Sequence, residues 1–179
     1  MALGKDTTAL QEINNHIDQG LNQKRAVERT VSVAIDLSQA FDTVNHEILL
    51  EDINNLVLND YIKRWLTAYI RGRQTFVEFR GRRSKFRKMR QGVPQGGVLS
   101  PVLFNLYMSK MPSPPGKIKL VSYADDSNVL NSGRKLDPIC QELNVYLATL
   151  DDWFRERNLF ISPAKSTATV FTTWENVSL

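Results

Sequence analysis

Apolar residues recur along the chain with two different periods, one typical of strands and one typical of helices. From Val31 to Leu37 they occupy every second position, which predicts a half-buried strand with Asp36 on its polar face. A similar strand is expected at Thr167–Phe171, and β-hairpins are expected over 74–89 and 118–131. Helical spacing predicts helices from Thr8, within 48–57, within 61–70, from Ser100 to Met111, and from Asp137 onward.

The order of these elements predicts an α+β fold. With residues 43–90 set aside as an inserted helical and hairpin segment, the order is strand, helix, strand, strand, helix, strand, the split βαβ (ferredoxin-like βαββαβ) arrangement. We expect a single domain over 1–179, with its core in 30–42 and 91–172 and helices on one face of the sheet. A right-handed crossover would make the first two strands parallel.

This topology predicts that three acidic residues meet. The end of the first strand and the turn of the 118–131 hairpin would share one edge of the sheet, which brings Asp36 to Asp125 and Asp126. Clustered carboxylates repel one another unless a cation neutralises them, and their hard oxygens suit Mg²⁺ or Mn²⁺. Two such ions support nucleotidyl transfer. The alternative for an Asp at a tight turn is local backbone capping.

Positive charge is concentrated in one segment. The whole chain carries a net charge of +4, but Arg71–Arg90 carries +8 and the remainder −4, as a surface that contacts nucleic-acid phosphates would require. A solvated face is the alternative for such a charge run. The candidate phosphate-binding residues are Arg80, Arg82, Arg83, Lys85, Arg87, Lys88 and Arg90. The single cysteine, Cys140, and the lack of a long apolar run predict an intracellular chain without membrane contact.

Three segments then carry a family resemblance. Residues 34–42 (AIDLSQAFD), 90–101 (RQGVPQGGVLSP) and 123–126 (YADD) resemble, in order and spacing, the catalytic motifs of the reverse transcriptases of non-LTR retrotransposons of the LINE or jockey type. The resemblance implies a polymerase palm. It also implies an RNA template, a DNA primer and deoxynucleoside triphosphates as partners, and a nuclear and cytoplasmic location.

Residue roles follow from the resemblance, position by position. It implies that Asp36 and Asp125 hold two Mg²⁺ or Mn²⁺ ions, with the Leu37 carbonyl as a further ligand and Asp126 as a second-line carboxylate. Lys165 matches a fourth motif, in which a lysine protonates departing pyrophosphate, although Ser162 stands where the family has Asn; the alternative for Lys165 is a solvated turn residue. The residues implied to contact the incoming nucleotide are Phe41, as a steric gate against the 2′-hydroxyl, Gln95, Gly96 and Tyr123. For Phe41 the alternative is a core phenylalanine.

Two functions remain open on the sequence. Further family motifs that form the fingers, and a thumb, have no counterpart in these residues, so we expect a truncated copy. The first hypothesis is the catalytic palm of an RNA-directed DNA polymerase, and the second is a remnant that binds nucleic acid without catalysis. A nucleotide cyclase is disfavoured by the Gln95 loop and the basic hairpin. His16 and His46 lack metal-ligand spacing and are expected on polar helix surfaces, and Asp42 is expected to cap a helix.

Overall fold

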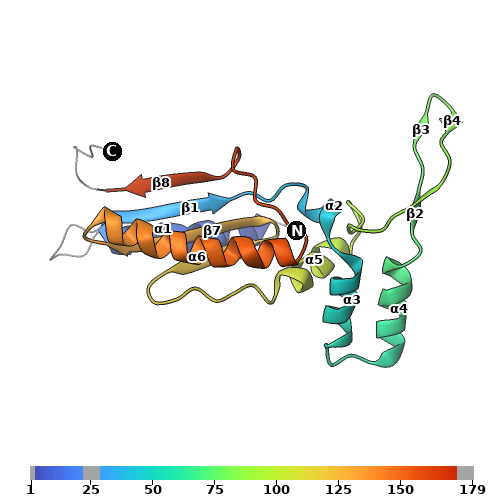
Figure 1. Ribbon diagram of the computed structural model, residues 1–179, viewed down its shortest axis with the longest axis horizontal. Coiled ribbons are helices and arrows are strands. Elements are labelled where there is room, and N and C mark those ends of the chain that lie inside the picture. Colours follow the sequence, from blue (N-terminus) through green and yellow to red (C-terminus); the bar gives the residue numbers. More distant parts are fainter. Residues whose placement is uncertain (1–2, 22–28, 173–179) are drawn as a thin grey trace. The chain divides into compact units, whose positions relative to one another are not determined.

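The structure is a computed structural model that describes residues 3–21 and 29–172 (Figure 1). It divides into two compact units. Among the described residues, the sheet unit comprises those up to Ser38, Met111–Glu156 and those from Phe160 onward, and the helical unit comprises Gln39–Lys110 and Arg157–Leu159. None of the helices in the described ranges is long and apolar enough to cross a membrane.

The sheet unit is built on one four-stranded antiparallel sheet with the order β6-β7-β1-β8. Because β1 and β6 are both antiparallel to β7, they run in the same direction without being neighbours. The strands are β1 (Arg29–Ile35), β6 (Lys119–Tyr123), β7 (Asp126–Gly133) and β8 (Thr167–Phe171). The expected bounds of β8 are confirmed, whereas β1 begins and ends two residues earlier than its alternation predicted.

Two helices cover opposite faces of this sheet. On β7, Asn131 donates to Glu142 of α6 (Leu136–Glu156) at 2.9 Å, whereas the hydroxyl of Ser132 lies 3.2 Å from Nε2 of His16 in α1 (Leu3–Leu21). Consecutive strand residues point to opposite faces. The expectation of helices on one face is therefore wrong for this unit. The physical reason is that Leu130 lies on the α1 face and is fully buried, so a helix must cover that face as well.

Helix α1 starts earlier than expected. It begins at Leu3, so Thr8 lies inside the helix and the predicted helix start at that residue is wrong. His16 faces the sheet rather than a polar surface, and burial, followed by the nearby charge of Lys119, lowers the pKa of its imidazole. His16 is thus disposed to be neutral where it meets the hydroxyl of Ser132.

The helical unit contains four helices and two short pairs of strands among its described residues. Asn45 caps α3 (His46–Asn54) and Asn59 caps α4 (Asp60–Ile70), since their side chains accept hydrogen bonds from backbone amides of the first turn. The helices are α2 (Ala40–Thr43), α3 (His46–Asn54), α4 (Asp60–Ile70) and α5 (Ser100–Met108), and the strands are β2 (Gln74–Thr75), β3 (Glu78–Phe79), β4 (Arg82–Arg83) and β5 (Arg87–Lys88). The apolar face of α4 is only partly covered, because Trp65 is 49% exposed.

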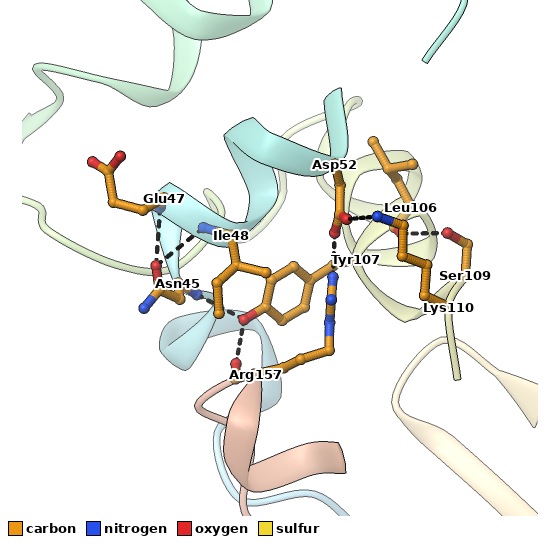
Figure 2. Close-up of polar contacts among 9 residues, drawn as sticks. All are labelled: Asn45, Glu47, Ile48, Asp52, Leu106, Tyr107, Ser109, Lys110 and Arg157. Atoms are coloured by element: carbon orange, nitrogen blue, oxygen red, sulfur yellow. Dashed lines mark hydrogen bonds and ion pairs between the residues drawn. The ribbon is translucent and has the colours of Figure 1, made fainter. Parts of the chain in front are cut away.

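An ion cluster centred on the buried carboxylate of Asp52 lies in the helical unit (Figure 2). Asp52 of α3 is 3% exposed and pairs with Nζ of Lys110 at 2.7 Å and with the guanidinium of Arg157. That guanidinium lies 4.4 Å above the ring of Tyr107, whose hydroxyl donates to the Arg157 carbonyl. Burial raises the pKa of the Tyr107 hydroxyl, which keeps the donor protonated. The cluster joins α3, α5 and the segment at Arg157.

Removing one partner from such a buried pair leaves an uncompensated charge in the interior. We expect Asp52→Asn to lower the free energy of unfolding by about 3 kcal/mol, measured by urea denaturation. Glu51→Gln is the matched control, because Glu51 is the exposed neighbour in the same helix, and its effect should stay within about 0.5 kcal/mol. Equal small effects of the two substitutions would contradict a stabilising role for the cluster.

Candidate active site

The register of the sheet places the three predicted acids at one edge of the sheet unit. Ile35, the last residue of β1, pairs with Ser127 of β7. Asp36 follows Ile35 and Asp126 precedes Ser127, so these two acids stand at the same end of neighbouring strands. Tyr123 pairs with Asp126, which leaves Ala124 and Asp125 as the turn between β6 and β7. Ala124 adopts a left-handed φ of 53°, as tight hairpin turns require.

The side chains of these acids share an edge without forming a closed ligand cluster. Among the described residues, no group of three or more His, Cys, Asp or Glu side chains is arranged to hold a metal ion. Asp36 nevertheless offers a suitable oxygen, since its Oδ1 is buried and accepts no hydrogen bond from the residues that the structure describes. A buried oxygen without a donor is costly, and a hard cation would satisfy it. This carboxylate oxygen therefore suits a divalent ion chemically, although the described acids are not grouped around one.

Lys165 lies beside Asp36. Its Nζ is 3.7 Å from Asp36 Oδ1, and its side chain is 69% exposed. The turn that carries it is tied to the backbone of Asp36 on both sides: the Ser162 amide donates to the Asp36 carbonyl at 2.8 Å, and the Asp36 amide donates to Oγ of Ser166 at 3.1 Å. That hydroxyl in turn donates to the Ser162 carbonyl at 2.9 Å. Lys165 and Asp36 are thus held next to each other by one main-chain bond and by the hydroxyl of Ser166.

Leu37 continues β1 as an isolated bridge to Ile161. The hydrogen bonds that flank this bridge use the Asp36 carbonyl and the Ser38 amide, which donates to the Phe160 carbonyl at 2.8 Å. The Leu37 carbonyl therefore lies outside those bonds. The Leu37 side chain is buried, at 4% exposure, so its contribution to a site would be the carbonyl oxygen predicted from the resemblance.

Gln95 and Phe41 lie in the helical unit, and each has a defined partner there. Nε2 of Gln95 donates to the two carboxylate oxygens of Asp42 at 2.9 and 3.0 Å. The ring of Phe41 stacks on that of Phe104, with centroids 4.5 Å apart. Asp42 is not a helix cap as expected, because it lies within α2 and Asn45 caps the helix that follows. The contact between Asp42 and Gln95 orients the amide of Gln95.

The loop that carries Gln95 begins at a glycine that tolerates no side chain. Gly92 has a φ of 85°, and a Cβ there would lie 2.8 Å from the Asp42 carbonyl oxygen. The Gly92 carbonyl accepts a hydrogen bond of 2.8 Å from Nε2 of His46. The expected surface position of His46 is therefore wrong: the imidazole is buried and positions this loop. At Gly96, by contrast, an added Cβ would meet no atom within 4 Å.

The predicted basic hairpin is present, and its two strand pairs, β2 with β5 and β3 with β4, differ in register. Phe79 pairs with Arg82 across a turn at Arg80 and Gly81, and further along Thr75 pairs with Arg87. Between the two pairs the register shifts by one residue, which marks a bulge. All seven predicted phosphate-binding residues are exposed. Glu78 pairs with Nε of Arg83 at 2.7 Å.

Sequence comparison identifies the class of protein. Residues 3–176 match the family of reverse transcriptases (RNA-dependent DNA polymerases), and the chain belongs to this family. It is 34% identical over 170 residues to the probable RNA-directed DNA polymerase from transposon BS of Drosophila melanogaster, and 28% identical over 169 residues to the RNA-directed DNA polymerase from mobile element jockey of Drosophila funebris. These alignments cover 91% and 90% of this chain but 18% of each relative. The predicted kinship with non-LTR retrotransposon enzymes is confirmed.

A solved structure shares the fold. Telomerase from Candida tropicalis, in complex with a fragment of telomeric RNA, superposes with a TM-score of 0.70 at 14% identity. The superposition covers 92% of this chain and 29% of the telomerase chain. The two proteins therefore share a fold, an antiparallel sheet with helices, although their sequences differ widely.

The two glycines of the Gln95 loop allow a matched test of its packing. Gly92→Ala should lower the free energy of unfolding by about 3 kcal/mol, because the methyl group meets both a left-handed backbone and the Asp42 carbonyl. Gly96→Ala meets only the backbone penalty, with a φ of 76°, and should cost about 1 kcal/mol. Thermal or urea unfolding of both variants measures the difference. Equal losses would show that the approach of Asp42 to Gly92 is not tight.

Proposed function

We propose that this chain carries the nucleotidyl-transfer centre of an RNA-directed DNA polymerase, the palm, with its core in 30–42 and 91–172. In this role it extends the 3′-hydroxyl of a DNA primer along an RNA template, using deoxynucleoside triphosphates. The observation that carries the proposal is the pairing of Ile35 with Ser127, because this register brings Asp36 to the edge where Asp125 and Asp126 lie. Family membership supports the same chemistry.

Asp36 and Asp125 are the proposed ligands of two Mg²⁺ or Mn²⁺ ions, together with the Leu37 carbonyl, and Asp126 supports them as a second-line carboxylate. The buried Asp36 Oδ1, which accepts no hydrogen bond from the described residues, supports this assignment. When bound, divalent ions at this site would supply Lewis-acid activation of the primer hydroxyl and neutralise charge on the leaving pyrophosphate. Lys165, with its exposed ammonium near Asp36, is proposed to donate a proton to that pyrophosphate.

The incoming nucleotide is proposed to contact four residues. Phe41 would exclude a 2′-hydroxyl, and its stacking on the buried ring of Phe104 would hold it rigidly enough to do so. Gln95 would contact the nucleotide and the template, oriented by Asp42. Gly96 and Tyr123 complete the set, and the basic hairpin would hold nucleic-acid phosphates.

Primer extension on an RNA template with Mn²⁺ tests the proposal. We expect incorporation by the 179-residue chain and its loss in Asp36→Asn and Asp125→Asn. Asp137→Asn should change nothing, because Asp137 is an exposed acid in the first turn of α6. In parallel, Mn²⁺ should broaden the amide NMR signals of Asp36 and Asp125 in the unsubstituted chain, and this broadening should be lost in Asp36→Asn.

Equal broadening in Asp36→Asn and the unsubstituted chain would overturn the metal assignment. Metal-independent binding of RNA without any synthesis would support the alternative, a remnant that binds nucleic acid without catalysis. Because the NMR measurement needs no turnover, it tests the carboxylates separately from the whole reaction.

The steric role of Phe41 has its own test. Phe41→Ala should lower the discrimination between deoxyribonucleotides and ribonucleotides by about tenfold or more, because the ring no longer meets the 2′-hydroxyl. The ratio of the two incorporation rates is the measurement, since it cancels general losses of activity. Phe104→Leu perturbs the same ring stack but keeps the Phe41 side chain. Equal effects of the two substitutions on the ratio would indicate a core role for Phe41.

A further inference from the structure

The basic hairpin also carries exposed aromatic rings that phosphate binding does not require. Phe79 is 69% exposed, Phe86 is 64% exposed, and Phe76 is 37% exposed. All described positions from 74 to 88 are exposed, so the hairpin has no core of its own in which these rings could be buried. Figure 1 shows the hairpin projecting beyond α4 within the helical unit. Exposed apolar groups gathered in this way mark a binding surface.

The rings are interleaved with guanidinium groups. Arg83 lies over the ring of Phe76 at 5.2 Å, and Arg80 lies over the ring of Phe79 at 5.3 Å. Phe86 contacts Phe76 edge to face, with ring centroids 5.1 Å apart. These contacts place positive charge over the rings of Phe76 and Phe79, and Phe86 lies next to the first of them. The surface therefore offers aromatic faces and phosphate-binding groups together.

The positive charge of the hairpin indicates which class of partner binds this surface. The segment Arg71–Arg90 has a net charge of +8, which favours a polyanion over an apolar protein surface. Among polyanions, single-stranded nucleic acid offers what these rings can use, because its unpaired bases are free to stack on aromatic side chains. In a duplex the bases already stack on one another, so only the terminal pairs expose a face.

We propose that Phe79 and Phe86 stack on unpaired bases of a single-stranded nucleic acid, while the neighbouring arginines hold its phosphates. This inference rests on the proposed function and specifies which part of the nucleic acid the hairpin contacts. The hairpin would bind a single-stranded stretch, where the bases are unpaired. Phe76 supports Phe86 through the edge contact and holds Arg83 in place.

An abasic strand separates stacking from phosphate contact. Fluorescence anisotropy would compare a single DNA strand of about 16 nucleotides with a strand of the same length whose bases are removed, in a buffer with EDTA. We expect the unsubstituted chain to bind the base-bearing strand about a hundredfold more tightly, at about tenfold for each of the two rings. Phe79→Ala and Phe86→Ala should each reduce this preference about tenfold without changing the affinity for the abasic strand.

Two controls define the expected pattern. Val77→Ala removes an exposed aliphatic side chain of the same hairpin, 68% exposed, and should leave the preference unchanged. Phe79→Trp should retain it. The dependence of affinity on salt should be the same in the Phe variants as in the unsubstituted chain, and weaker in Arg82→Gln, because only the latter removes a phosphate contact.

Equal affinity of the unsubstituted chain for the two strands would overturn the stacking proposal. So would an equal loss of affinity for both strands in the Phe variants. The measurement uses no divalent metal, so its outcome is independent of the broadening at Asp36. A preference for the base-bearing strand without Mn²⁺ broadening at Asp36 would support stacking and overturn the proposed metal site. Mn²⁺ broadening without a preference for the base-bearing strand would overturn the stacking proposal alone.

Discussion

The pairing of β1 with a neighbour on each side is the constraint on which the proposed chemistry depends. Through β7, the register brings Asp36 to the edge that carries Asp125 and Asp126. On its other side, the segment that precedes β8 bonds to the backbone of Asp36 and carries Lys165. A slip of one residue would turn every side chain of β1 to the opposite face. The sheet therefore fixes the carboxylates and the lysine together.

The alternation of apolar residues was enough to predict the strands of the sheet, but it did not predict which helix packs on each of the two faces. The strand at Thr167–Phe171 and the hairpin before it follow from period-two patterns, which reflect a property of each strand alone. The second covered face was missed because it carries polar residues: Thr30 and the hydroxyl of Ser132 bond to each other at 2.8 Å beneath α1. Such residues are read as solvent-facing until their partners are known.

The same limit applies to the candidate site. The motifs predicted Gln95 and Asp36 as site residues, but not the side chains that position them. Gln95 is held by Asp42, 53 positions away in sequence, and the Asp36 amide by Ser166, 130 positions away. Neither partner has a local pattern that indicates its role. His46 has the same difficulty, because its bond to the Gly92 carbonyl, 46 positions away, becomes visible only once the loop is folded.

The return of the chain at Arg157–Leu159 makes the helical unit discontinuous in sequence. A fragment that stops at Lys110 would retain Asp52 but lose the arginine that pairs with it and the carbonyl that accepts from Tyr107. This unit therefore cannot be excised as one contiguous stretch of gene with its interior satisfied. A transplant of the unit into a relative would have to carry both Gln39–Lys110 and Arg157–Leu159, on either side of the sheet-unit segment Met111–Glu156.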